Sequence, residues 1–230
     1  MIDKQRLIEK GARYQMDLTS CAPQLELYAK LLVDYNEKVN LTAITDPEGI
    51  EDRHFIDSLL LANQPEVTGS LVDVGTGAGF PGVVVKLYKP ELSLSLMEPT
   101  GKRLDFLRFL CKELGIQAEF IKERGEEAAR KEWREKFDVA TARAVAGLPV
   151  LLEYCLPLVH VGGVFAAMKG SADEEPAGRS ACEKLGGVFL EKRQYFLPQG
   201  EERNLLFYKK ISQTSPVYPR NGGKIAKKPL

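Results

Sequence analysis

The feature that most restricts the fold of this chain is the stretch LVDVGTGAGFPG at residues 71–82. An apolar run ends there in an acid, Asp73, and four glycines follow within eight positions. Glycine adopts left-handed backbone conformations without steric cost, so this density of glycines directly after an apolar run predicts a tight turn. The pattern is typical of a buried strand that turns into a helix around a ligand.

Strands and helices are predicted to alternate from this turn onward. The short links between them favour crossover units and a parallel sheet. The last two predicted strands follow each other across Pro198-Gln199-Gly200, which favours an antiparallel hairpin at one edge. We therefore predict the α/β class: a Rossmann-like, mostly parallel seven-stranded sheet in the layout of class I methyltransferases. The strands are expected near residues 70–74, 92–97, 117–121, 137–141, 162–168, 187–195 and 203–210, and the helices between them near 80–89, 101–114, 124–132, 147–158 and 173–186.

Further segments flank this core. Apolar residues recur at helical spacing over residues 3–16, 24–39 and 50–62, which predicts three helices before the first strand. The final stretch PVYPRNGGKIAKKPL is too rich in proline and glycine to favour a regular element. The expected divisions are a helical cap at residues 1–66, the methyltransferase-like core at 67–212 and a tail at 213–230.

Charge is distributed unevenly along the chain. Lysine plus arginine and aspartate plus glutamate both number 32, so the formal net charge is zero. From Arg203 to Leu230 there are seven basic residues and no acid, which leaves 25 basic against 32 acidic residues in the rest. A basic tail on an acidic body favours a polyanionic partner, because docked lysines and arginines release counterions from phosphates. A solvated, disordered terminus is the alternative interpretation.

The composition argues against membrane, metal and disulfide sites. The longest apolar runs, such as VLLEYCLPLV, fall far short of the ~20 residues that a membrane span needs. The four cysteines lie 90, 44 and 27 residues apart, without a Cys-x-x-Cys pair. That spacing gives neither a zinc motif nor a disulfide framework. We therefore expect no metal and a reducing, cytoplasmic location.

The glycine-rich turn fits two nucleotide cofactors by spacing. Gly-x-Gly-x-x-Gly over residues 77–82, with Glu98 about 20 residues on, matches a dinucleotide site. An acid followed by Gly-x-Gly-x-Gly, over residues 73–79, fits S-adenosylmethionine. Pro81 has no N–H to offer a pyrophosphate, and Asp73 would repel its charge, whereas the ammonium and sulfonium of S-adenosylmethionine favour an acid. A purely structural glycine turn is the remaining alternative. The expected cofactor contacts are Asp73, Gly75, Gly77 and Gly79, with Glu98 at the ribose hydroxyls.

Two more segments follow strands, at the edge of the sheet where this fold binds ligands. Gly125 and Glu126, after the third predicted strand, are expected within reach of an adenine. The alternative for Glu126 is an acid favoured at a helix start by the helix dipole. Arg143, flanked by alanines after the fourth strand, is expected to pair with the cofactor's carboxylate or with an RNA phosphate.

Motifs that the chain lacks narrow the methyl acceptor. Methylation of an exocyclic amine commonly uses an Asn/Asp-Pro-Pro-aromatic signature after the fourth strand, where this chain has TARAVA. Carbon-5 methylation of pyrimidines needs a cysteine nucleophile, and Cys155 in LEYCLPL is better explained as a core residue. An acceptor with its own lone pair, such as a ring nitrogen, remains. Its methylation needs no general base, only in-line placement of the two reacting atoms.

Six segments together resemble one known family. NLTAIT, RHFIDSL, LVDVGTGAGFPG, GKRLDFL, ARAVA and FAAMKG occur in the order found in the ribosomal RNA small subunit methyltransferase G family, also called glucose-inhibited division protein B. The resemblance extends over nearly the whole chain. It implies methyl transfer from S-adenosylmethionine to nitrogen 7 of one guanine in 16S ribosomal RNA.

The resemblance also assigns residues. It implies cofactor contacts at Gly75, Phe80, Gly125, Glu126 and Arg143, and a ribose border at Glu98, Pro99 and Thr100. Members vary at Pro99-Thr100, which leaves the backbone contacts there open. His54 and Asp57, with Arg143, are catalytic candidates beside the target base. A His54–Asp57 hydrogen bond within the third predicted helix is the structural alternative.

Nitrogen 7 lies on the purine edge that the narrow major groove of A-form RNA hides, so we expect a splayed-out guanine. The substrate is either naked 16S rRNA or an assembly intermediate, and the chain is expected to be a monomer. Removal of the tail is expected to weaken RNA binding and leave cofactor affinity unchanged. The alternatives are a small-molecule methyltransferase, a non-catalytic cofactor-sensing RNA-binding protein and a nucleotide-dependent oxidoreductase. The RNA-binding candidates are Arg53, Lys209, Lys210, Tyr218, Arg220, Lys224, Lys227 and Lys228.

Overall fold

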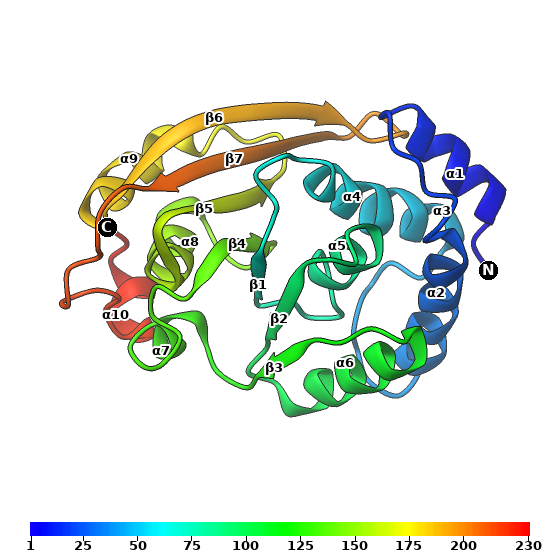
Figure 1. The fold of residues 1–230 in the computed structure, drawn as a ribbon, viewed down its shortest axis with the longest axis horizontal. Helices are drawn as coiled ribbons and strands as arrows, with labels where there is room; N and C mark the ends of the chain where they lie inside the picture. The colour runs from blue at the N-terminus through cyan, green and yellow to red at the C-terminus, as the bar shows by residue number, and fades with distance from the viewer.

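A seven-stranded sheet forms the centre of the computed structural model, which describes all 230 residues (Figure 1). The strand order is β3-β2-β1-β4-β5-β7-β6. Strands β1 to β5 pair in parallel, whereas β7 is antiparallel to both of its neighbours. The order reverses between β1 and β4, and α/β folds bind ligands at the carboxyl edge of such a switch point. The strands are β1 (Ser70–Val74), β2 (Ser93–Met97), β3 (Glu119–Ile121), β4 (Phe137–Arg143), β5 (Val159–Lys169), β6 (Gly187–Phe196) and β7 (Glu202–Lys210).

Helices cover both faces of the sheet, and an apolar cluster fills each interface. A cluster of 41 buried residues joins α2, α4, α5 and α6 to one face, and a cluster of 23 joins α8 and α9 to the other. The predicted fold class and edge hairpin are therefore confirmed. No helix combines the length and the apolar character that crossing a bilayer requires. The helices are α1 (Lys4–Ala12), α2 (Ala22–Asn36), α3 (Pro47–Gly49), η1 (Ile50–Ile56), α4 (Asp57–Ala62), α5 (Gly82–Tyr88), α6 (Gly101–Leu114), α7 (Gly125–Ala128), α8 (Leu148–Cys155), η2 (Leu156–Leu158), α9 (Glu175–Lys184) and α10 (Gly222–Lys227).

The third N-terminal helix differs from the uniform helix that was predicted. It starts early as α3, because the Asp46 side chain accepts a hydrogen bond from the Gly49 N–H at 2.7 Å and caps the first turn. Residues 50–56 then form a π-helix, η1, before α4 resumes the α-helix. Such π-helical turns are rare and often occur at functional sites.

Buried ion pairs fix η1 in place. The fully buried Glu51 carboxylate accepts hydrogen bonds from the side chains of Arg6 at 2.7 Å and Lys10 at 2.9 Å, both from α1. The Lys10 ammonium also reaches Asp52 at 2.5 Å. These bonds attach α1 to η1, the helix that also contains Arg53.

The end of the chain is packed against the core. Residues 211–230, called the C-terminal strap below, run from β7 along α8 to α7 (Figure 1). Arg134 donates hydrogen bonds to the carbonyl oxygens of Thr214 at 2.5 Å and Tyr218 at 2.9 Å, and Ile225 of α10 is fully buried. The expectation of no regular element in the strap is wrong, because tertiary contacts stabilise a helix that the Pro- and Gly-rich composition disfavours.

Candidate cofactor and acceptor sites

The glycine-rich turn joins β1 to α5 and is braced by the acid that precedes it. Asp73 Oδ2 accepts hydrogen bonds from Thr76 Oγ1 at 2.6 Å and from the Gly82 N–H at 2.8 Å. Asp73 is fully buried, which raises its pKa to about 6, and its Oδ1 has no hydrogen-bond partner. The first N–H of α5 is thus bonded to a carboxylate of the chain itself, which disfavours a pyrophosphate at this helix start.

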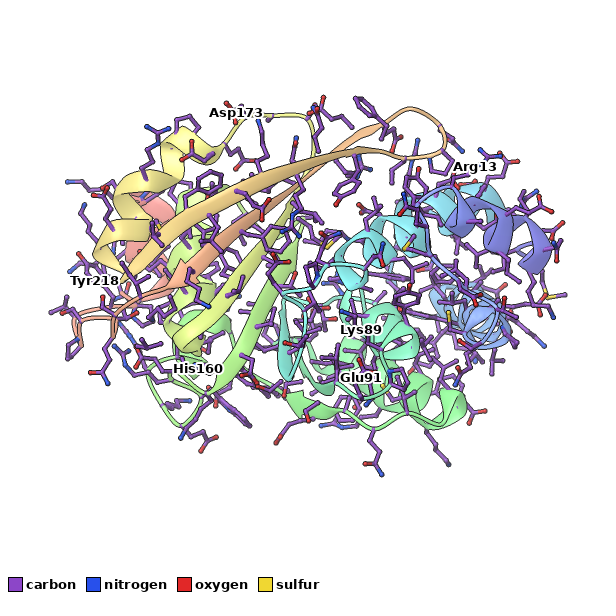
Figure 2. The ribbon with its side chains drawn as sticks, turned by 45° about the horizontal axis from the view of Figure 1, so that its top comes forward. Arg13, Lys89, Glu91, His160, Asp173 and Tyr218 are labelled. Carbon is purple, nitrogen blue, oxygen red and sulfur yellow. The ribbon has the colours of Figure 1, made fainter.

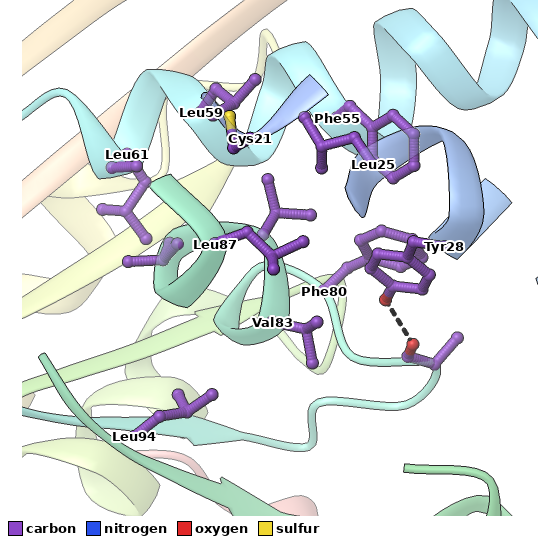
Figure 3. Close-up of a cluster of buried hydrophobic side chains, with 14 of the residues drawn as sticks. Cys21, Leu25, Tyr28, Phe55, Leu59, Leu61, Phe80, Val83, Leu87 and Leu94 are labelled. Atoms are coloured by element: carbon purple, nitrogen blue, oxygen red, sulfur yellow. Dashed lines mark hydrogen bonds between the residues drawn. The ribbon is translucent and has the colours of Figure 1, made fainter. Parts of the chain in front are cut away.

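Two glycines in the turn are required for different reasons. Gly79 has φ +102°, and a Cβ there would lie 2.6 Å from the Tyr28 hydroxyl oxygen. That hydroxyl donates a hydrogen bond to the Ala78 carbonyl at 2.6 Å, the dashed line in Figure 3, and so attaches α2 to the turn. Gly77 has φ +60°, and a Cβ there would meet nothing closer than the Gly75 carbonyl oxygen at 4.0 Å. Gly79 is needed for packing, whereas Gly77 leaves its backbone accessible.

Phe80 links the turn to the N-terminal helices. Its ring stacks on Tyr28 at a centroid distance of 5.0 Å, as Figure 3 shows, and on His54 at 4.3 Å. The Arg143 guanidinium carbon lies 5.2 Å from the centroid of the same ring. Phe80 therefore sets the relative positions of the glycine-rich turn, η1 and the end of β4.

Glu98 lies at the end of β2 beside this turn. Its carboxylate accepts hydrogen bonds from the Gly77 N–H at 3.2 Å and the Thr100 N–H at 2.8 Å, and the residue is almost fully buried. A carboxylate has about four lone-pair positions, so it keeps acceptors for further donors. Glu98 can therefore hold the turn and accept two ribose hydroxyls.

A small cavity of about 70 Å³ lies at the carboxyl edge of β1, β2 and β3. Its wall includes Gly125 and Glu126 of α7, as expected for an adenine site, and also Val145, which packs over Gly75. Burial raises the pKa of Glu126. The residues that line the cavity are Val74, Gly75, Pro99, Glu123, Arg124, Gly125, Glu126, Val145 and Tyr154.

A larger cleft of about 450 Å³ lies at the carboxyl ends of β4 and β5. It contains all three catalytic candidates, and Ala144, with a left-handed φ of 55°, lies in its wall. Four of the lining residues are basic and two are acidic, so the lining has a net charge of +2. The residues that line the cleft are Ile44, Arg53, His54, Asp57, Arg143, Ala144, Met168, Lys169, Gly170, Glu174 and Arg203.

Arg143 connects the catalytic candidates. Its Nη1 donates to Asp57 Oδ2 at 2.8 Å and to the Arg53 carbonyl at 2.9 Å, and its Nη2 lies 3.3 Å from His54 Nδ1. The structural alternative of a direct His54–Asp57 hydrogen bond is therefore wrong, because both side chains turn toward Arg143 instead. Three of the five guanidinium N–H groups are used, and two remain for an anion.

His54 is a neutral imidazole in this environment. Its Nδ1 faces an arginine N–H and acts as acceptor, so Nε2 carries the hydrogen and donates to Thr42 Oγ1 at 2.9 Å. Burial, with the nearby Arg143 charge, lowers the pKa of His54 to about 3. Both ring nitrogens are engaged, so His54 is not placed as a free general base.

The cleft contains two basic residues that were not predicted from the sequence. Arg203 of β7 lies 3.3 Å from Asp57 Oδ1, and Lys169 of β5 lies 3.0 Å from Glu174. Lys169 also donates to the Ala146 carbonyl at 2.8 Å, which holds the loop after β4. Lys169 belongs to the FAAMKG motif, so its position in that motif could have marked it as a site residue. Arg203 lies in no such motif and could not have been found in this way.

The predicted RNA-binding residues fall into separate places. Arg53 lines the cleft. In the pairing of β5 with β7, Asn204 lies opposite Lys169 of the cleft, whereas Lys209 lies opposite Val164. Lys209 and Lys210 are therefore at the end of β7 that is far from the cleft. Lys210 is fully buried with its ammonium 2.9 Å from the Leu156 carbonyl, so its prediction as an RNA contact is wrong.

The strap contributes the remaining RNA-binding candidates. Arg220 is paired with Glu153, and Tyr218 packs partly against the apolar cluster under α8, at the edge of the molecule in Figure 2. Lys224, Lys227 and Lys228 are exposed on and beside α10. These three lysines are therefore the strap residues that are free for a polyanion.

The two sites together fit S-adenosylmethionine. Glu98 keeps acceptors that suit ribose hydroxyls, Arg143 keeps two donors that suit a carboxylate, and Glu126 lines the small cavity where an adenine is expected. The first N–H of α5 is bonded to Asp73 and is not free for a phosphate. A SAM-dependent O-methyltransferase from Thermotoga maritima has the same fold, with a TM-score of 0.52 at 14% identity over 80% of this chain and 72% of its own. The fold is that of class I S-adenosylmethionine-dependent methyltransferases.

The family follows from sequence relatives. The GidB family model, described as rRNA small subunit methyltransferase G, matches residues 21–205. A relative of that name from Alkaliphilus metalliredigens is 44% identical over 214 residues, 90% of each chain, and one from Halalkalibacterium halodurans is 44% identical over 99% of this chain and 97% of its own. The chain belongs to the rRNA small subunit methyltransferase G family. It is a methyltransferase of small-subunit ribosomal RNA that uses S-adenosylmethionine.

Proposed function

We propose that the cleft receives a guanine of 16S ribosomal RNA and that nitrogen 7 of this base is the methyl acceptor. The observation that carries the proposal is that the cleft lies beside the glycine-rich turn and contains no free general base. Asp57 is paired with Arg143 and Arg203, Glu174 is paired with Lys169, and His54 has both nitrogens engaged. An acceptor that must lose a proton first is therefore disfavoured.

Guanine nitrogen 7 meets this condition because it already has a lone pair and carries no hydrogen. The cofactor, when bound, supplies an electrophilic methyl group, so that a bond from nitrogen to carbon forms as the bond to sulfur breaks and its electron pair stays on sulfur. The residues of the chain have the task of holding acceptor and donor in line, and such placement supplies most of the rate enhancement. His54, Asp57 and Arg143 are accordingly positioning groups.

We assign the cofactor contacts along the carboxyl edge of the sheet. Glu98, with Pro99 and Thr100 beside it, holds the ribose, and the glycine-rich turn lies along the methionine part. The two unused N–H groups of Arg143 bind the cofactor's carboxylate, since Arg143 stands between the turn and the cleft. Gly125 and Glu126 contact the adenine, where the Glu126 carboxylate accepts from the exocyclic amine.

The RNA backbone around the target guanine is held by the basic groups of the cleft rim. Arg53, Lys169 and Arg203 lie in the lining with net positive charge, which favours phosphate over neutral small molecules. The exposed Lys224, Lys227 and Lys228 add further positive charge that is accessible to RNA. The basic groups favour ribosomal RNA, naked or within an assembly intermediate, over a small-molecule acceptor.

We propose that the protein is cytoplasmic and monomeric. All four cysteines are free and buried, which agrees with a reducing compartment. Sedimentation of the purified chain at micromolar concentration would test the monomer, with a single species of 25.6 kDa as the expected result.

The decisive experiment for the acceptor is methyl transfer to small subunits from a strain that lacks the modification, with tritium in the methyl group. We expect label in 16S rRNA and chain cleavage at the labelled base under conditions specific for 7-methylguanine. A matched RNA with 7-deazaguanine at that position should take no label. Label that survives the 7-deaza substitution, or turnover with small molecules alone, would contradict the proposal.

A further inference from the structure

The C-terminal strap reaches the adenine end of the cofactor cavity. The family match ends at Leu205, so the strap lies outside the segment by which the family is recognised. Helix α8 connects the strap to the cavity. Tyr154 of this helix lines the cavity, and the preceding residue, Glu153, contacts the strap. One helix thus borders both the cavity and the strap.

Arg220 and Glu153 lock the strap in place. The Glu153 carboxylate is fully buried and accepts from the Arg220 backbone N–H at 2.8 Å, from Nε at 2.9 Å and from Nη2 at 2.6 Å. A fully buried carboxylate without a partner is unfavourable, so Glu153 strongly favours the docked arginine. Arg130 also donates to the Pro219 carbonyl at 2.8 Å, which fixes the residue before Arg220.

The docked strap places Gly222 next to the Glu126 side chain. A Cβ added at Gly222 would overlap Glu126 Oε1, whereas a Cβ added at Gly223 would meet nothing closer than Asn221 Oδ1 at 3.7 Å. Neither glycine has a positive φ. A side chain at position 222 would therefore displace the Glu126 carboxylate, and the effect would come from space and not from backbone conformation.

We propose that the C-terminal strap is part of the cofactor site: Gly222 positions the Glu126 carboxylate for the adenine amine, and the Arg220–Glu153 pair holds Gly222 there. Arg220, Glu153 and Gly222 are positioning residues. The inference rests on the proposed adenine contact of Glu126. It replaces the expectation that the last residues of the chain act on RNA alone.

The central test compares two neighbouring alanine substitutions in the full-length chain. Affinity for S-adenosylhomocysteine is measured by calorimetry without RNA, so the readout does not depend on methyl transfer. We expect G222A to weaken binding at least about fivefold, within the range typical of coupled sites, and G223A to change it less than twofold. Equal affinities for G222A and the parent chain would overturn the proposal.

A double-mutant cycle identifies the route of the effect. E126Q alone is expected to weaken binding, and G222A is expected to have little further effect in the E126Q background. An undiminished effect of G222A in that background would overturn the assignment of Gly222 to Glu126. An unchanged affinity of E126Q alone would instead overturn the adenine contact itself, so the two failures are distinguishable.

A measurement on the unsubstituted chain keeps the test valid if G222A does not fold. S-adenosylhomocysteine should slow hydrogen–deuterium exchange of the α10 amides, because a bound adenine fixes Glu126 and so the strap that packs on it. Exchange at residues 160–163, at the other end of the sheet, serves as the internal control. Unchanged exchange in α10 at saturating ligand would overturn the proposal.

Discussion

The glycine-rich turn and the cleft lie side by side but are built in different ways. In the turn, Asp73 binds Gly82, nine residues along the chain. In the cleft, Arg143 binds Asp57 and the Arg53 carbonyl, which are 86 and 90 residues away. The turn is therefore braced from within a short contiguous sequence, with added contacts from Tyr28 and Glu98, whereas the cleft depends wholly on the packing of η1, β4, β5 and β7 against each other.

This difference predicts how each region fails. A substitution in the turn should disturb the backbone there and abolish cofactor binding. A change in the cleft alters a chain of ion pairs in which each side chain has a second partner, as Asp57 has in Arg203. Damage in the cleft should therefore impair alignment more than folding. The predictions below test this contrast.

The largest effect is expected from G79A in the turn. The added Cβ would have to occupy a φ of +102° and lie 2.6 Å from the Tyr28 hydroxyl. We expect a loss of about 3 kcal/mol in the free energy of unfolding from backbone strain and overpacking, together with loss of S-adenosylhomocysteine binding. Urea denaturation and calorimetry measure the two quantities.

G115A is the matched control for that substitution. Gly115 has φ +67° and nothing within 4 Å of an added Cβ. Backbone strain alone should cost about 1 kcal/mol there, with cofactor affinity unchanged. Equal losses for the two variants would show that the packing around Gly79 has no special role.

A smaller effect on folding and a large one on activity are expected from R143M in the cleft. The variant loses the two free N–H donors and the link between His54 and Asp57, so alignment fails while Asp57 keeps Arg203. Single-turnover methyl transfer should fall on the order of 100-fold, about 2.7 kcal/mol. R179M, which breaks an exposed pair with Glu175, should leave both rate and stability nearly unchanged.

The pH dependence of stability should reveal the neutral His54. Its pKa is lowered from 6.5 to about 3, so between these values the unfolded chain binds a proton that the folded chain does not. Stability should therefore fall as the pH falls below 6.5, by about 2 kcal/mol down to pH 5 from this group. Urea denaturation of H54Q at several pH values should show a correspondingly flatter acid limb.

His160 provides a control of opposite sign. A hydrogen bond to Asp138 raises the pKa of His160, so its contribution is present below 6.5 and lost as the pH rises through the folded value. The side chain is 40% exposed, so solvent screening keeps the contribution small. In H160Q the free energy of unfolding should fall below pH 6.5 as steeply as in the parent chain. A fall as shallow as that of H54Q would refute the assignment to His54.

The smallest effect is expected from T42V. The substitution removes the oxygen that accepts from His54 Nε2 and from the Ile44 N–H. Loss of these bonds should lower the free energy of unfolding by about 1–2 kcal/mol and slow methyl transfer severalfold. T42S keeps the hydroxyl and should restore the rate. Failure of serine to do so would mean that the methyl group, and not the hydrogen bond, matters.

Local periodicity predicted most of the fold. The strand at residues 70–74 and the helix at residues 101–114 have the bounds expected from the sequence, because apolar spacing and the flanking turn residues are local signals. The π-helical turn at η1 and the helix α10 were not predictable in this way. Both depend on distant partners, the α1 side chains for η1 and Glu153 for the strap.

The sequence by itself determined the glycine-rich turn, the strand and helix alternation, and the family motifs that point to a methyl donor. These features depend on residues close in the chain, where backbone preference and side-chain period act directly. Only the tertiary structure decided that Arg143 joins His54 to Asp57, that Lys210 is internal, and that the strap lies against Glu126. Those contacts join residues far apart in the sequence, and a charged side chain carries no local mark of the partner it will meet.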